Sequence, residues 1–337
     1  MVCLGSVAAS PFLAAPLGAR EPSNTKPAVS QFVLSNGLQV LLEEDRRQKL
    51  VAIRMTYAIG SRDEPKAQRG IAHLVEHLTF RGSRHLKDDE MSALFQLAGA
   101  GDMNGETSAD ETSYHETVSS GALALGLWLE RERMAFTVEQ FNLQTLGSEQ
   151  AILHREEATR KAEDGTLIMA LLNAMSGDHR PYAEWTDDAP SVSNLTLQDA
   201  RSFFVRGHRP DNARLVLVGD FQSAAARSLI ERYFGAIQNP ALPKVEAPVG
   251  SAAPSAGGHL RLVRNLIRDD VVMGWRVPFA TVRDEARLHL FMTLVRSDWE
   301  RRAAPKEKRV ARLSISTLPL SLGSVCVIYA NLFAGAT

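Results

Sequence analysis

Gly70-Ile-Ala-His-Leu-Val-Glu-His-Leu-Thr-Phe-Arg-Gly-Ser83 is the stretch that decides how the rest of this chain is interpreted. It contains no Pro, and Gly stands only at its ends, so the pattern predicts a helix. At about 100° per residue, His73 and His77 fall one turn apart on one face, and Glu76 lies roughly 60° to the side of His73. The remaining side chains are apolar, so we expect a helix that is buried all round.

Two imidazoles and a carboxylate are costly to bury unless they are paired or bind a metal ion. The order His73-x-x-Glu76-His77 is the inverse of the commoner zinc-protease order His-Glu-x-x-His. In such a site the two His supply neutral nitrogen ligands, and the Glu acts as general base beside an open coordination position. The alternative from the same residues is a helix with two hydrogen-bonded core histidines and a salt-bridged Glu.

A zinc site with an open position needs one more protein ligand. A second helix is predicted over about 138–162, and within it Glu149 and Glu156 are seven residues apart and share nearly the same face. Glu157 fits the helix geometry as well, and spacing alone does not separate it from Glu156. The alternative for this acidic face is a solvated surface beside Arg155 and Arg160.

The composition describes a globular protein. The chain has 337 residues, 45% of them hydrophobic and 23% charged, with a formal net charge of −1. This length suggests two domains, and the missing basic excess argues against a nucleic-acid-binding protein. Cys3 and Cys326 are too few and too far apart for a disulfide framework, and they do not fix the redox compartment.

Residues 1–19 are small and apolar, with no charged side chain before Arg20. They are too short and too interrupted by Pro to span a membrane, so no membrane span is expected. They resemble the apolar part of a secretory signal without its basic leading region, and a disordered tail fits equally well. We expect a leader and linker over 1–30, with a periplasmic or secreted protein if 1–19 is a signal remnant and a cytoplasmic one otherwise.

Strand and helix patterns alternate in the next two hundred residues, which predicts an α+β fold. A hairpin is expected over 32–42, with its turn at Asn36-Gly37. Further strands are expected at 51–59, in a segment that ends at 118, and at 214–218. Helices are expected at 88–98, 121–133, a segment that Thr196 would cap, and 224–237.

Several short motifs lie in the same order as in one known family. Besides His73-x-x-Glu76-His77, they occupy 34–38 (Leu-Ser-Asn-Gly-Leu), 60–64 (Gly-Ser-Arg-Asp-Glu), 80–83 (Phe-Arg-Gly-Ser), 104–114, 179–182 and 210–220. The chain thereby resembles the pitrilysin or insulinase-type inverzincin metallopeptidases, a group that includes the mitochondrial processing peptidase. The resemblance covers about residues 31–240.

This resemblance implies a role for each matching residue. His73, His77 and Glu156 would bind one Zn²⁺ per chain, and Glu76 would activate water. Glu149 would support a His ligand without binding the metal, as outer carboxylates do. Asn104 would contact the backbone of a peptide substrate. The family commonly has Ala after that Asn, whereas Gly105 stands here, so the sequence departs from the family pattern at this edge and not at the metal site.

The resemblance also implies a domain order. The catalytic domain would cover 31–240, an antiparallel sheet flanked by helices. A linker rich in Pro, Ala, Ser and Gly follows at 241–258, and 259–337 would be a partial second domain of the same type. The Arg/Tyr pair with which the family's later domain or partner chain holds substrate is not found in the sequence. We therefore expect a homo- or heterodimer in which a partner supplies the rest of the substrate chamber.

The sequence thus predicts a zinc-dependent metalloendopeptidase that hydrolyses peptides or unfolded segments. Two alternatives stay open. One is a non-catalytic partner or assembly subunit with the same fold. The other is a truncated, inactive fragment or structural domain that only binds zinc.

Overall fold

The computed structural model describes residues 29–88, 90–162, 171, 175, 192–243, 270–277, 282–302, 310–318 and 324–332. The predictions for a leader up to residue 28, for the motif at 179–182, for the linker beyond 243 and for the beginning of the second domain at residue 259 lie outside the described residues.

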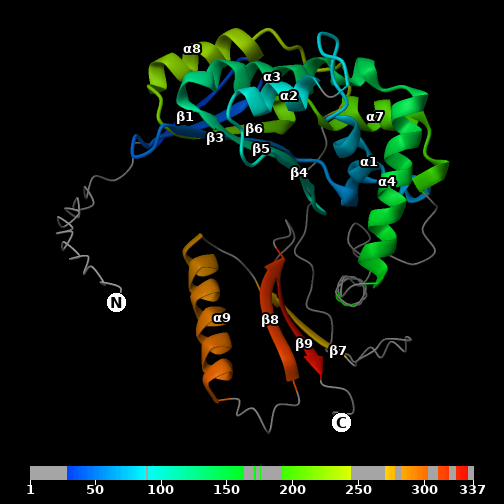
Figure 1. The fold of residues 1–337 in the computed structure, drawn as a ribbon, viewed down its shortest axis with the longest axis vertical. Helices are drawn as coiled ribbons and strands as arrows, with labels where there is room; N and C mark the ends of the chain where they lie inside the picture. The colour runs from blue at the N-terminus through cyan, green and yellow to red at the C-terminus, as the bar shows by residue number, and fades with distance from the viewer. Residues whose placement is uncertain are drawn as a thin grey trace, which may run out of the picture.

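A six-stranded sheet forms the centre of the larger part of the fold (Figure 1). Its strands are β1 (Val29–Val33), β2 (Gln39–Glu44), β3 (Leu50–Tyr57), β4 (Asn104–Thr107), β5 (Thr112–Ser119) and β6 (Ala213–Gly219). Their order is β1-β2-β6-β3-β5-β4. The expected antiparallel pairing holds for every neighbouring pair except β2 and β6, which run parallel. Together with the helices below, this confirms the α+β class.

The predicted first hairpin is present, but its connection is longer than a two-residue turn. β1 and β2 pair from Val33 with Gln39, so residues 34–38 form the loop. Gly37 adopts a φ of +92°, which suits the residue without a side chain. Asn36 Nδ2 donates to the carbonyl oxygens of Phe234 and Ile237 at 2.8 and 3.0 Å. The loop is therefore held by distant main-chain acceptors and not by local turn geometry alone.

Helices cover the sheet and gather at its β4 end. They are α1 (Ile71–Leu78), α2 (Glu90–Leu97), α3 (Leu123–Phe136), α4 (Leu143–Ala162), α7 (Leu197–Gly207) and α8 (Ser223–Phe234). Short 3₁₀ turns are η1 (Ser61–Asp63), η2 (Lys66–Gln68), η3 (Ser120–Ala122), η4 (Thr137–Gln140), η5 (Val192–Asn194) and η6 (Pro210–Asn212). Figure 1 shows α2, α3 and α8 over one face of the sheet, whereas α1 packs against α4, α7 and β4. The expected cap of α7 is confirmed, because Thr196 Oγ1 accepts from the backbone N–H of Asp199 at 3.1 Å.

A second, three-stranded sheet follows later in the chain. It consists of β7 (Asp270–Val277), β8 (Val310–Leu318) and β9 (Ser324–Leu332) in the antiparallel order β7-β9-β8, and α9 (Val282–Arg302) packs against β8. Within the described parts of the chain, none of the helices combines the length and apolar character needed to cross a bilayer.

A polar cluster lies inside the larger core, between the sheet and the helices. His208 is 4% exposed, its Nε2 lies 3.0 Å from Tyr114 Oη, and its ring stacks on Phe204 with centroids 4.6 Å apart. Burial, followed by the nearby Arg133 guanidinium, lowers the pKa of His208 to about 3. The folded protein therefore keeps this imidazole neutral.

The buried His208 predicts a loss of stability in mild acid. In the unfolded chain its pKa returns to about 6.5, so only the unfolded state gains a proton as the pH falls below that value. This group's contribution is complete above pH 6.5 and is lost as the pH falls toward 3. At pH 5 we expect the free energy of unfolding to drop by about 2 kcal/mol through His208. Urea unfolding at pH 7.5 and 5.0 measures the drop, and in His208→Gln it should shrink by that amount. An equal drop in both proteins would contradict the prediction.

Candidate metal centre

The helix that carries the candidate ligands is α1, and its ends are fixed by side chains. At its start the Glu64 carboxylate accepts the backbone N–H groups of Gly70 and Ala72, both at 3.0 Å. At its end Thr79 Oγ1 donates to the Glu76 carbonyl at 2.7 Å. The predicted helix is confirmed. It is not buried all round, however, because the His73 and His77 side chains remain 26% and 17% exposed. The face that carries the imidazoles is thus open to a ligand or ion.

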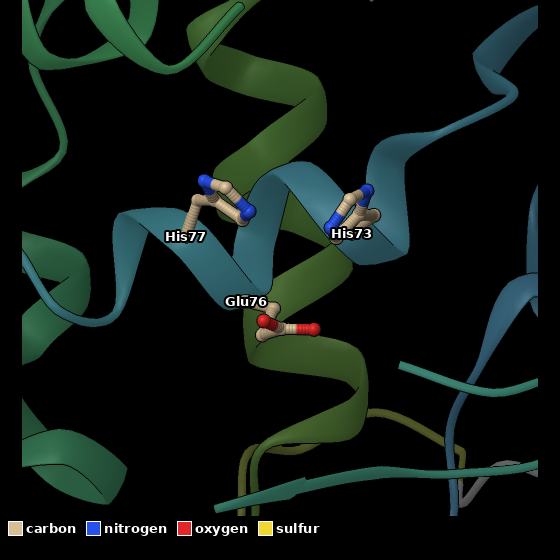
Figure 2. Close-up of side chains that lie close together, drawn as sticks. All are labelled: His73, Glu76 and His77. Carbon is tan, nitrogen blue, oxygen red and sulfur yellow. The ribbon is translucent and has the colours of Figure 1, made fainter. Parts of the chain in front are cut away.

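The two imidazoles lie next to each other. The rings of His73 and His77 have centroids 4.7 Å apart and are nearly perpendicular, at 88°. His73, Glu76 and His77 each offer one potential ligand atom, and these three atoms lie within 4.8 Å of one another. Figure 2 shows the two rings side by side along α1 and the Glu76 carboxylate on another side of the helix.

Glu156 on α4 faces both imidazoles. Its Oε2 lies 3.4 Å from His73 Nε2 and 3.8 Å from His77 Nε2. Ligand atoms at zinc distances in a tetrahedral site are separated by about 3.3 Å. The carboxylate oxygen is therefore spaced from both nitrogens much as zinc ligands are spaced from one another. Two nitrogens and one carboxylate oxygen are also a donor set that zinc accepts.

Glu149 lies behind His77, on the side away from Glu156. It is 2% exposed, and its Oε2 lies 2.8 Å from His77 Nδ1. Burial opposes its ionisation, but the hydrogen bonds from His77 and Arg81 outweigh it and lower the pKa of Glu149. Burial likewise opposes a charge on His77, but the hydrogen bond with Glu149 and the carboxylates of Glu156 and Glu76 raise the pKa of its imidazole. The surroundings therefore favour positive charge at this point, as a cation site requires.

Glu76 is held by the edge strand. Its Oε2 accepts a hydrogen bond from Thr107 Oγ1 on β4 at 2.6 Å, and burial raises the pKa of the carboxyl group in spite of that bond. A Cβ added to Gly105 would lie 3.0 Å from both Cγ and Oε1 of Glu76. The departure from the family pattern at Gly105 therefore lets β4 approach Glu76 without a methyl group in between.

Asn104 begins β4 and is exposed to solvent. β4 stands at the end of the six-stranded sheet, paired on one side with β5. Its outer edge meets no other strand among the described residues. The contact between Asn104 and substrate stays a prediction.

Two contacts of the site were not found from the sequence. Arg81 and Thr107 belong to motifs that assign them no partner, yet each donates to a predicted site carboxylate. Arg81 follows His77 by four residues, and this spacing could have predicted that the two side chains lie on the same side of the helix. For Thr107 no signal existed, because its partner is reached only through the packing of β4 on α1.

Two imidazoles on one helix, faced by a carboxylate from a second helix and flanked by a buried acid, are typical of hydrolytic zinc sites. Comparison with known proteins agrees with this class. The family model described as "Insulinase (Peptidase family M16)" matches residues 39–180, and that described as "Peptidase M16 inactive domain" matches 194–309. The chain belongs to peptidase family M16, the zinc-protease family that the sequence resemblance indicated.

Individual relatives are similar over much of this chain. The zinc protease PqqE of Helicobacter pylori is 28% identical over 305 residues, which cover 86% of this chain and 66% of that protein. The peroxisomal insulin-degrading enzyme-like 1 of Arabidopsis thaliana is 26% identical over 72% of this chain and 25% of its own length. The crystal structure of a protease from Helicobacter pylori superposes with a TM-score of 0.78 at 24% identity, over 92% of this chain and 76% of that one. The chain thus spans less than two thirds of these two sequence relatives.

Proposed function

We propose that this chain is the zinc-binding catalytic part of a metalloendopeptidase, with residues 31–240 as its catalytic domain. The observation that carries the proposal is the convergence of His73 Nε2, His77 Nε2 and Glu156 Oε2 at 3.4 and 3.8 Å. We assign the metal to these three residues, one ion per chain. Zinc, when bound there, supplies a Lewis acid that polarises a peptide carbonyl and makes water acidic enough to attack it.

Glu76 is the general base in this proposal. Its carboxylate accepts a proton from the attacking water and then donates it to the amide nitrogen as the carbon–nitrogen bond breaks. Burial raises the pKa of Glu76, which brings it closer to the neutral range where a group can both accept and return a proton. Thr107, by donating to one carboxylate oxygen, leaves the other oxygen for that exchange.

The substrate would be an extended peptide. We propose that it pairs with the outer edge of β4, where Asn104 contacts its backbone, since strand addition to a free sheet edge is a common mode of peptide recognition. The chain spans less than two thirds of the sequence relatives described above, and we propose that a second subunit or further chain, as homo- or heterodimer, completes the chamber around that peptide.

Removal of the metal tests the proposal directly. A chelator is expected to abolish hydrolysis of an unfolded peptide by the purified chain, and stoichiometric zinc should restore it while magnesium should not, because the donor set contains two imidazoles. Zinc binding without hydrolysis, even after addition of candidate partner chains, would instead support the non-catalytic alternatives. Hydrolysis that survives complete loss of zinc would exclude the proposed mechanism.

A further inference from the structure

Arg81 lies just past the end of α1 and reaches back to the metal site. Its backbone N–H bonds the Leu78 carbonyl at 3.2 Å, which continues the turn of the helix. Its Nε donates to Glu149 Oε1 at 2.6 Å, and its Nη2 forms an ion pair with the same oxygen. Because the Glu149 side chain is only 3% exposed, water has little access to its carboxylate, and salt weakens this contact less than it would weaken an exposed pair.

The two oxygens of Glu149 are thereby divided between two partners. Oε1 receives Arg81, and Oε2 faces His77 Nδ1 at 2.8 Å. A carboxylate fixed through one oxygen can still rotate, whereas this one cannot turn without breaking both contacts. In the proposed metal site an ionised Glu149 would accept the proton of Nδ1 and hold the plane of the His77 ring, which would leave the lone pair of Nε2 for the metal.

We propose that Arg81 is a positioning residue of the metal site, acting through Glu149 on His77. This inference rests on the proposed function, because it assumes that His77 Nε2 is a zinc ligand. Arg81 also keeps Glu149 out of the coordination shell, since both oxygens of that acid are engaged. The arrangement accounts for two acids on one face of α4 having different tasks, with Glu156 available to the metal and Glu149 committed to the ring behind it.

The other contact of Arg81 has a minor part. Its Nη1 lies 3.5 Å from Asp88 Oδ1, and the Asp88 side chain is 48% exposed, so this pair is worth little. A matched control stands three residues further on. Arg84 Nε donates to Glu139 Oε2 at 2.7 Å, with both side chains exposed, and neither member is among the candidate site residues.

The test is zinc affinity, measured by competition with a chromogenic chelator in the full-length chain, for wild type, Arg81→Met, Arg81→Lys and Arg84→Met. We expect Arg81→Met to weaken zinc binding about tenfold, the lower end of the range for outer partners of metal ligands. Arg81→Lys should lie in between, because Lys keeps the charge without the planar fork. Arg84→Met should match wild type.

A second measurement separates positioning from general damage. If Arg81 acts through Glu149, then Arg81→Met should cost little further affinity in a Glu149→Gln background. The visible absorption of bound Co²⁺ should also change in Arg81→Met, because the band reports coordination geometry, and should stay unchanged in Arg84→Met. Should Arg81→Met fail to fold, Arg81→Lys carries the same comparison.

The outcomes are distinguishable. If the wild-type chain binds zinc, and the Arg81 variants have the same zinc affinity and the same Co²⁺ spectrum, this inference is overturned and the proposed function is not. Additive losses in the double variant would overturn the route through Glu149. No zinc binding by the wild-type chain would overturn the proposed function and the inference together.

Discussion

Glu76→Gln is expected to lower peptide hydrolysis about a thousandfold while leaving zinc binding unchanged, since general acid–base groups contribute on the order of 10²–10⁴ in rate. Gln has nearly the same shape and still accepts the hydrogen bond from Thr107, but it takes no proton from water. Initial rates on an unfolded peptide, together with metal content by atomic absorption, measure both effects.

The control for this variant is Glu111→Gln. Glu111 lies in the connection between β4 and β5, its side chain is 47% exposed, and its carboxylate is 3.5 Å from Arg54. Its loss should change turnover only slightly. Full turnover in Glu76→Gln would remove Glu76 from its role, and loss of zinc in that variant would move it into the metal's ligand set.

Glu156→Gln is expected to weaken zinc binding by at least about a hundredfold, more than the loss of an outer partner costs, because an anionic ligand becomes a neutral amide. Hydrolysis should fall with the zinc content and recover partly at high zinc concentration. Isothermal titration of the apoprotein with zinc gives the affinity, and turnover is followed in parallel.

Glu157→Gln is the matched control for this second variant. The two acids are adjacent on α4 and point about 100° apart. The change at 157 should leave zinc affinity within the error of the measurement. If Glu157→Gln released zinc and Glu156→Gln did not, Glu157 would replace Glu156 as the third ligand. The proposed arrangement of Glu156 with the two imidazoles would then be wrong.

Local features of this fold could be predicted from the sequence, because they depend on neighbouring residues. The helical spacing of His73 and His77, the Thr196 cap and the pairing of β1 with β2 arise within a few residues of chain, although distant main-chain acceptors hold the hairpin loop. Glu156 and Glu157 could not be separated in this way, because the choice depends on how α4 packs against α1. The hydrogen bond from Thr107 to Glu76 depends on the same kind of long-range packing.

The order of the strands in the sheet could not be predicted from the sequence pattern either. The residues of β6 read as a buried strand, but their alternation does not tell which strands they pair with. In the structure β6 lies between β2 and β3, parallel to one and antiparallel to the other. A parallel partner needs no turn nearby, and so leaves no local signature.

The place of β6 has a consequence for biosynthesis. A ribosome delivers both imidazoles and Glu156 well before residues 213–219, yet those residues join β1–β2 to β3–β5–β4. A nascent chain that has reached only α4 carries every candidate ligand, with its sheet still in two pieces and two open edges between them. For the proposed metal site, only the two imidazoles of α1 would share a common frame at that stage, and the placement of α4 against α1 would be completed once β6 joins the two pieces of the sheet.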